Sequence, residues 1–160
     1  LENVMIGASK SASSGLISSA LGLSGRDEER LKQRSMTALE RVYASGIADM
    51  RADSLPYPVT KRVAIARALV SEPKILLLDE PFAALDVMTI KNLQKIIVDL
   101  QFQNNISIIL CDHQARDLLA CVDVAAIIHN GKVIAEGTPS NLIQNVEARN
   151  AYFGEAFKIN

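Results

Sequence analysis

Apolar residues spaced three or four positions apart predict three amphipathic helices along this chain. Residues with that spacing share one helix face, which lets them pack into a core. The first pattern covers residues 26–44, with Gly46 as its expected C-terminal stop. The second ends near Pro73, and the third extends from Asp86, its expected cap, to about Gln103. The expected core positions are Leu31, Ala38, Leu39, Val42, Val63, Ala66, Leu69, Val70, Ile90, Leu93, Ile97 and Leu100.

Short apolar runs between these helices predict strands. Ile75–Leu78 is entirely apolar, and Ser107–Cys111 repeats the pattern. Neither run alternates, which is typical of strands buried on both faces. Farther along, Asn130-Gly131 separates the runs 122–129 and 132–135 and strongly favours a tight hairpin. The remaining expected elements are a short helix around residues 114–120 and a helix that starts at Thr138-Pro139.

Composition narrows the class of protein. The 160 residues are 49% hydrophobic, enough for one core, and the net charge of −1 gives no electrostatic reason to expect a nucleic-acid partner. No apolar stretch approaches the ~18 residues that span a bilayer, so membrane association would come through a partner. Cys111 and Cys121 lie in apolar segments and are expected to be reduced core residues of a cytosolic protein. Residues 9–25, rich in Ser, Gly and Ala, predict either a short helix or a mobile loop.

Acidic residues follow the first strand directly. Asp79 and Glu80 close the apolar run, at the sheet edge where open parallel sheets bind ligands. Two negative charges beside an apolar core are costly unless a cation or a proton offsets them. Mg²⁺ is the expected cation, since it prefers carboxylate oxygens and substrate phosphates. A solvated acidic turn is the alternative. His113 ends the second strand, so it would share this edge with Glu80 if the strands are parallel neighbours.

These motifs resemble those of the ATP-binding-cassette (ABC) ATPases. Residues 75–80 are similar to the Walker B strand and catalytic glutamate, Ala84–Asp86 to the D-loop, and His113 to the switch histidine. Ala66–Leu69 matches the helix between the signature and Walker B. Several linked motifs in the family's order are more specific than any single motif. The end of the chain, residues 151–157, resembles the members that serve branched-chain amino-acid uptake and lipopolysaccharide export.

The resemblance implies a fold and a domain plan. The expected class is α/β, a P-loop NTPase-like ABC domain fragment with a mainly parallel sheet flanked by helices. Residues 1–62 would form a helical subdomain with the signature region. Residues 63–160 would form the C-terminal part of the ATPase core, with a β-hairpin and C-terminal helices. No Gly-x-x-x-x-Gly-Lys-Ser/Thr occurs in the chain, so the Walker A and Q-loop segments are expected upstream, and tight ATP binding by this piece alone is not expected.

The resemblance also implies roles for the residues at the acidic edge. Asp79 would hold Mg²⁺ through a bound water, and Glu80 would orient or deprotonate the water that attacks ATP. His113 would contact the terminal phosphate, and Asp86 would couple two sites across a dimer interface. Structural alternatives stay open: Glu80 as a turn residue, His113 as a capping or packed residue, and Asp86 as a helix cap, a role that can coexist with coupling.

The signature position departs from the family pattern. Leu55, Pro56, Tyr57 and Pro58 stand where the family has Leu-Ser-Gly-Gly-Gln or Leu-Ala-Tyr-Gly-Gln. In the family this loop binds the terminal phosphate held by the opposite subunit. Proline lacks an N–H and restricts φ, so the loop loses donors and freedom. Weak hydrolysis is expected, or a degenerate site in a heterodimer. The basic pair 61–62 would lend compensating positive charge or be ordinary surface residues.

Two function classes follow. The first is the ATP-hydrolysing subunit of a membrane transporter, using ATP and Mg²⁺. It would act as a homo- or heterodimer with transmembrane permease subunits, on the cytoplasmic face of the membrane. The second is a catalytically degenerate module that binds partners or nucleotide without turnover. A DNA-repair or chromosome-organising ATPase would need long coiled coils, and the chain shows no sustained heptads.

Overall fold

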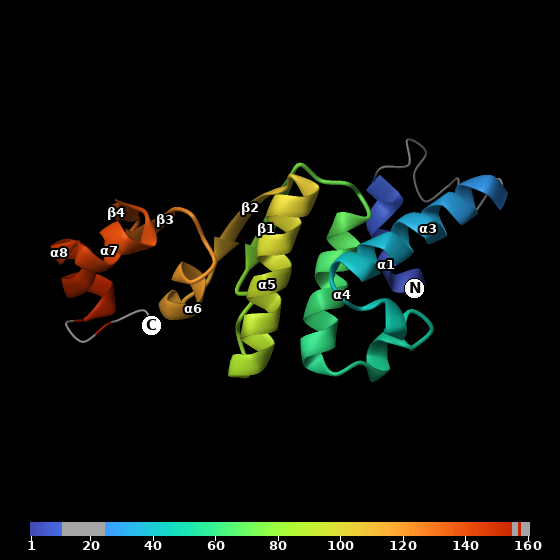
Figure 1. Ribbon diagram of the computed structural model, residues 1–160, viewed down its shortest axis with the longest axis horizontal. Coiled ribbons are helices and arrows are strands. Elements are labelled where there is room, and N and C mark those ends of the chain that lie inside the picture. The colour runs from blue at the N-terminus through green and yellow to red at the C-terminus, as the bar shows by residue number, and fades with distance from the viewer. Residues whose placement is uncertain (11–24, 155–156, 158–160) are drawn as a thin grey trace. The chain divides into compact units, whose positions relative to one another are not determined.

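The computed structural model describes residues 1–10, 25–154 and 157 as helices and short strands (Figure 1). Contacts divide the chain into two compact units, residues 1–77 with 99–109 and residues 78–98 with 110–160. The boundary follows contacts rather than family roles, so the expected division at residue 62 stays a prediction. Most of the segment for which a short helix or a loop was expected, residues 11–24, lies outside the described residues.

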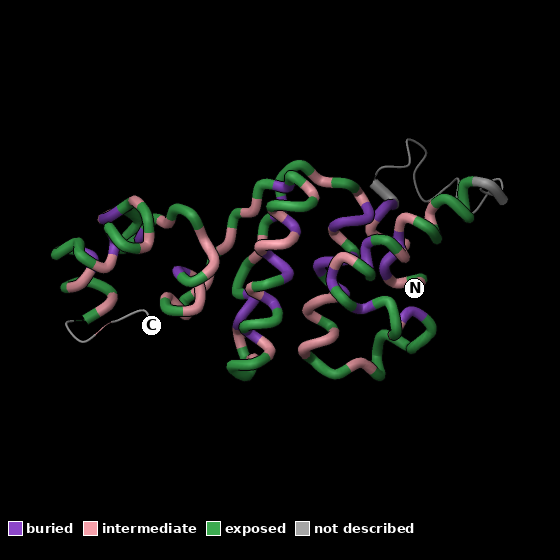
Figure 2. The backbone as a smooth tube through the Cα atoms, viewed as in Figure 1, coloured by how far each residue is buried: buried purple, intermediate pink, exposed green. Residues whose placement is uncertain are grey.

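The first unit is mainly helical. Its helices are α1 (Glu2–Met5), α3 (Gly25–Arg41) and α4 (Tyr57–Leu69), with the 3₁₀ turns η1 (Ile6–Lys10), η2 (Ser45–Ile47) and η3 (Ala52–Ser54). Helices α3 and α4 contact each other. Of the positions expected to form their apolar stripes, Leu31 is partly buried and the others are buried; buried positions are purple in Figure 2. A Cβ at Gly7 would come within 1.8 Å of the Arg67 carbonyl oxygen, so only glycine allows η1 to lie this close to α4.

The expected stop of α3 at Gly46 is wrong. The helix ends earlier because Tyr43 adopts a left-handed conformation with φ of 53°. Its N–H donates to Glu40 (2.9 Å), and the N–H of Ala44 donates to Leu39 (2.8 Å), which is the Schellman arrangement. The guanidinium of Arg62 donates to the Tyr43 carbonyl at 2.8 Å. Arg62 therefore caps the negative end of α3.

The strands β1 (Ile75–Asp79) and β2 (Ser107–Cys111) form a two-stranded sheet. The N–H of Ser107 donates to the Lys74 carbonyl at one end, and the N–H of Glu80 donates to the Cys111 carbonyl at the other. The residue numbers of the bonded partners rise in the same direction along both strands, so the strands are parallel. Among the described residues, β1 and β2 form this parallel pair, and β3 and β4, described next, form an antiparallel pair.

The expectation that both faces of these strands are buried is wrong. Leu76 is buried, but Ile75, Leu77 and Ile109 are 57%, 70% and 60% exposed. The physical reason is that the described residues cover only alternate side chains of each strand. Cys111 is also exposed and is not a core residue, whereas Cys121 is partly buried.

The second unit contains the ends of β1 and β2 and the elements that follow them. These elements are α6 (Ala115–Leu119), β3 (Ala125–His129), β4 (Lys132–Gly137), α7 (Pro139–Gln144), α8 (Val146–Ala148) and the π-helical turn η4 (Arg149–Phe153). Helix α5 (Val87–Asn104) contributes residues to both units.

The expected hairpin and cap in this unit are confirmed. Asn130 and Gly131 have φ of 48° and 73° between the antiparallel strands β3 and β4, as a type I′ turn requires. The hydroxyl of Thr138 accepts from the N–H of Asn141 at the start of α7. The core of this region consists of Leu119, Ile127, Ala135, Leu142 and Ala148. None of the described helices is long and apolar enough to span a membrane.

Candidate functional site

The candidate site begins where β1 ends. Asp79 is the last residue of the strand, and Glu80 follows with φ of 45°, a left-handed conformation that stops the extended chain. The N–H of Glu80 still donates to the carbonyl of Cys111 at 2.7 Å, so the residue stays attached to β2. Both acidic side chains are exposed. The adjacent Phe82 is fully buried and anchors the turn that leads to α5.

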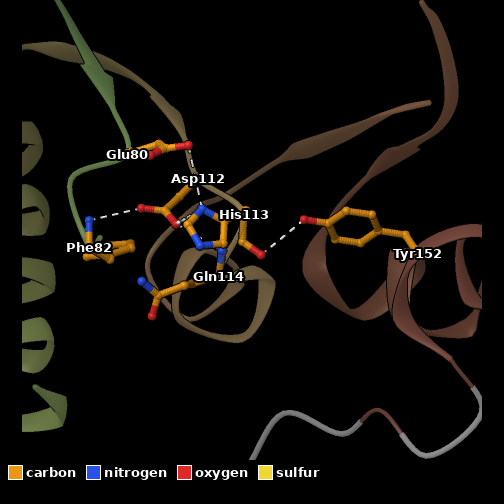
Figure 3. Close-up of polar contacts among 6 residues, drawn as sticks. All are labelled: Glu80, Phe82, Asp112, His113, Gln114 and Tyr152. Atoms are coloured by element: carbon orange, nitrogen blue, oxygen red, sulfur yellow. Dashed lines mark hydrogen bonds and ion pairs between the residues drawn. The ribbon is translucent and has the colours of Figure 1, made fainter. Parts of the chain in front are cut away.

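His113 lies beside Glu80, as the strand ends predicted. Its Nδ1 atom is 3.7 Å from the Oε1 atom of Glu80 (Figure 3). Both side chains are more than half exposed, so a ligand from solvent can reach them. The hydroxyl of Tyr152, from η4, donates to the His113 carbonyl at 3.2 Å and attaches the C-terminal segment to this loop.

Asp112 is a residue whose part in the site was not recognised from the sequence. Its side chain is fully buried although its neighbour His113 is exposed. One carboxylate oxygen accepts from the N–H of Phe82 and the other from the N–H of Gln114, both at 2.9 Å (Figure 3). An acidic residue directly after an apolar strand was the available signal. Asp112 therefore joins the loop after β1 to the loop after β2.

Asp86 caps α5, as expected. Its Oδ1 atom accepts from the N–H groups of Met88 and Thr89, both at 3.0 Å. The hydrogen bonds from Thr89 are the main reason that the pKa of Asp86 lies below its ordinary value. The coupling role expected for Asp86 is compatible with this cap and stays a prediction.

The signature residues form the start of α4, in the first unit. Pro56 is the N-cap, and its carbonyl accepts from the N–H groups of Val59 and Thr60 at 2.9 and 3.0 Å. Pro58 lies in the first turn, where helices tolerate proline. Of residues 56–58, Tyr57 carries the remaining backbone N–H. The ammonium of Lys61 is 5.5 Å from the centre of the Tyr57 ring, so positive charge is present near this turn.

The acidic edge suits a metal that a substrate helps to hold. Among the described residues, no group of three or more His, Cys, Asp or Glu side chains is arranged to bind a metal alone. Mg²⁺ at phosphate sites uses one or two carboxylates and completes its shell with phosphates and water. Asp79 and Glu80 are adjacent in the sequence and both are exposed, which fits this requirement.

Comparison with known proteins identifies the family. The family model described as "ABC transporter" matches residues 5–83. The lipopolysaccharide export ATP-binding protein LptB of Haemophilus influenzae is 34% identical over 131 residues, covering 82% of this chain and 54% of LptB. This chain belongs to the ABC transporter ATP-binding subunits. The high-affinity branched-chain amino acid transport ATP-binding protein LivG of Salmonella typhimurium is 32% identical over 158 residues, covering 98% of this chain and 62% of LivG.

Solved structures confirm the ABC fold class. CbiO1 from Clostridium perfringens superposes with a TM-score of 0.74 at 31% identity, covering 92% of this chain and 53% of CbiO1. The ATP-binding cassette MJ1267 superposes with a TM-score of 0.77 at 26% identity, covering 96% of this chain and 62% of MJ1267. The chain spans about half the length of the first curated relatives that it matches.

Proposed function

We propose that this chain is part of the ATP-hydrolysing subunit of an ABC membrane transporter, in which ATP hydrolysis is coupled to solute transport. The observation that carries the proposal is the 3.7 Å approach of the Glu80 carboxylate and the His113 imidazole. Both follow parallel strands at one sheet edge, and both are accessible to solvent. This placement supports a role for both groups in the attack of water on a bound terminal phosphate.

Each residue has a chemical task in this proposal. Asp79 would hold Mg²⁺ through a bound water, and the ion when bound would supply charge neutralisation for the phosphates. Glu80 would orient the attacking water and accept its proton, because its carboxylate is exposed beside the strand end. His113 would donate a hydrogen bond to the terminal phosphate. Asp86 would link two such sites in a dimer.

The proposed partners follow from the family. CbiO1 is described as part of the transporter complex CbiONQ, and LptB as part of an export system. We infer for this chain a second nucleotide-binding subunit and transmembrane permease subunits. Attachment to the permease would place the chain on the cytoplasmic face of the membrane. Leu55–Pro58 would face the nucleotide of the second subunit.

The substitution Glu80→Gln in the complete gene product tests this function. We expect kcat for ATP hydrolysis to fall by about 10²–10⁴-fold, because the amide cannot accept the proton, while ATP binding persists. Phosphate release measures the rate, and calorimetry measures binding. The matched control is Glu136→Gln on β4, an exposed acid away from the candidate site, which should hydrolyse ATP at the parent rate. Full hydrolysis by Glu80→Gln would refute the assignment.

A second function, the non-hydrolysing module, is favoured by one observation. Pro56 is the N-cap of α4 and Pro58 lies in its first turn, and the Pro56 carbonyl already accepts from the N–H groups of Val59 and Thr60. Few backbone donors remain for a phosphate held by a partner. Under this alternative, the complete gene product would bind ATP but release no phosphate.

A further inference from the structure

The buried carboxylate of Asp112 connects the two loops that carry Glu80 and His113. We propose that Asp112 is a positioning residue, which holds these two side chains at their working separation without touching the substrate. This inference rests on the proposed function, since it concerns how the same site is maintained. The contacts of Asp112 carry it.

Each hydrogen bond of Asp112 ends close to one of the two exposed side chains. Phe82, the first donor, follows Glu80 by two residues, and Gln114, the second donor, follows His113 directly. Both donor–acceptor distances are 2.9 Å. The side chain has no exposed surface, so water does not compete for its oxygens. A change at Asp112 is therefore transmitted to both loops together.

The backbone of the first loop needs such support. Glu80 and Ala84 have φ of 45° and 59°, and non-glycine residues rarely adopt these left-handed values. Such conformations persist only where the surrounding structure holds them. The Phe82 N–H lies between the two strained residues, and its bond to Asp112 holds the loop at that point.

The carboxylate is suited to this task because it has two equivalent acceptor oxygens. An asparagine has nearly the same shape but one carbonyl oxygen, and its NH₂ group cannot accept a hydrogen bond. Asp112→Asn would therefore leave the N–H of Phe82 or of Gln114 without its acceptor in a buried place. The substitution removes one bond with little change in volume.

The test compares the parent complete gene product with Asp112→Asn and with a matched control, Thr138→Val. Thr138 also accepts one backbone N–H, that of Asn141 at the start of α7, but it has no contact with the Glu80 or His113 loops among those described. Amide hydrogen exchange, followed by NMR without nucleotide, reports the loops directly. ATP hydrolysis gives kcat and KM separately.

We expect Asp112→Asn to speed exchange of the Phe82 or Gln114 amide at least tenfold, with the amides of β3 and β4 unchanged. We expect kcat to fall at least tenfold and KM for ATP to change less than threefold, because orientation is lost rather than binding. Thr138→Val should affect exchange in α7 and keep the parent kcat.

Three results would overturn the positioning role. They are parent-like exchange at both amides, a parent-like kcat, and loss of protection throughout the unit, which would mark Asp112 as a general stability residue. A parent protein that releases no phosphate refutes the proposed function instead. An active parent with a fully active Asp112→Asn variant refutes only the role of Asp112.

Discussion

Glu80 serves the sheet and the candidate site at once. Its N–H completes the last hydrogen bond between β1 and β2, while its side chain lies beside His113. The left-handed backbone ends the strand abruptly, so the carboxylate is held close to the sheet edge. If several loop residues separated Glu80 from the end of β1, its carboxylate would not be held close to the sheet edge in this way. The strain at Glu80 is thus linked to the position that the proposed chemistry needs.

The two cysteines differ in ways that are measurable at the scale of single residues. Cys111 is exposed on β2. Burial raises the pKa of the Cys121 thiol to about 11, with smaller contributions from the charges of Asp117 and Asp112. The thiol of Cys121 also donates weakly to the Leu118 carbonyl at 3.4 Å. A thiol reacts as its thiolate, so the two cysteines should be alkylated at different rates.

We expect iodoacetamide at pH 8 to label Cys111 well before Cys121. With a pKa of about 11, roughly one Cys121 thiol in a thousand is ionised at that pH. While the pH is below this pKa, each increase of one pH unit should raise the labelling rate of Cys121 about tenfold, since the thiolate fraction rises by that factor. Peptide mass spectrometry measures both rates, and Cys111→Ser isolates the slower one. Equal rates at the two sites in the folded protein would contradict this expectation.

At the scale of elements, the first turn of α4 decides how many donors the signature position offers. Pro58→Gly restores an N–H and backbone freedom, and we expect kcat for ATP hydrolysis to rise about tenfold or more, since a transition-state donor contributes on the order of 10²–10³ in rate. The matched control is Pro139→Gly, because Pro139 occupies the first turn of α7. Both substitutions raise the conformational entropy of the unfolded chain by a similar amount. Unchanged turnover in Pro58→Gly would show that the proline does not limit hydrolysis.

The elements also show where sequence patterns suffice. Helices α3, α4 and α5 were predicted because their apolar spacing is local, and their expected core positions are buried except Leu31, which is partly buried. The end of α3 was not predicted. Tyr43 ends the helix with the help of Arg62 and through a bond from its hydroxyl to Asp99 at 2.7 Å. Those partners are 19 and 56 positions away along the chain, so no local pattern contains them.

In the whole molecule, some parts of the candidate site follow from local sequence patterns, and others depend on partners that are distant in the chain. The approach of Glu80 and His113 could be predicted because parallel strands end at one sheet edge. The role of Asp112 could not, because it depends on two N–H groups whose positions arise only after the loops fold. The burial of β1 could not be predicted either. An apolar run shows that a strand can be buried, but it does not show which elements cover its faces.

The exposed apolar side chains of β1 and β2 lead to a prediction about the behaviour of the molecule in solution. Ile75, Leu77 and Ile109 are all more than half exposed on two adjacent strands, and apolar groups gathered in this way promote self-association. We expect the double substitution Leu77→Thr and Ile109→Thr to weaken self-association of the chain at least threefold, measured by sedimentation equilibrium. Threonine is favoured in strands and replaces apolar surface with a hydroxyl at both exposed positions.

The β3–β4 hairpin offers a matched comparison for this effect. Ile128 and Val133 are also exposed and directly paired, but they are two residues rather than three. Ile128→Thr with Val133→Thr should therefore weaken association less than the β1–β2 pair does. Binding of an apolar dye should fall in the same order, since the dye reports the same accessible surface. If the hairpin variant had the larger effect, the hairpin would be the surface through which copies of this chain associate.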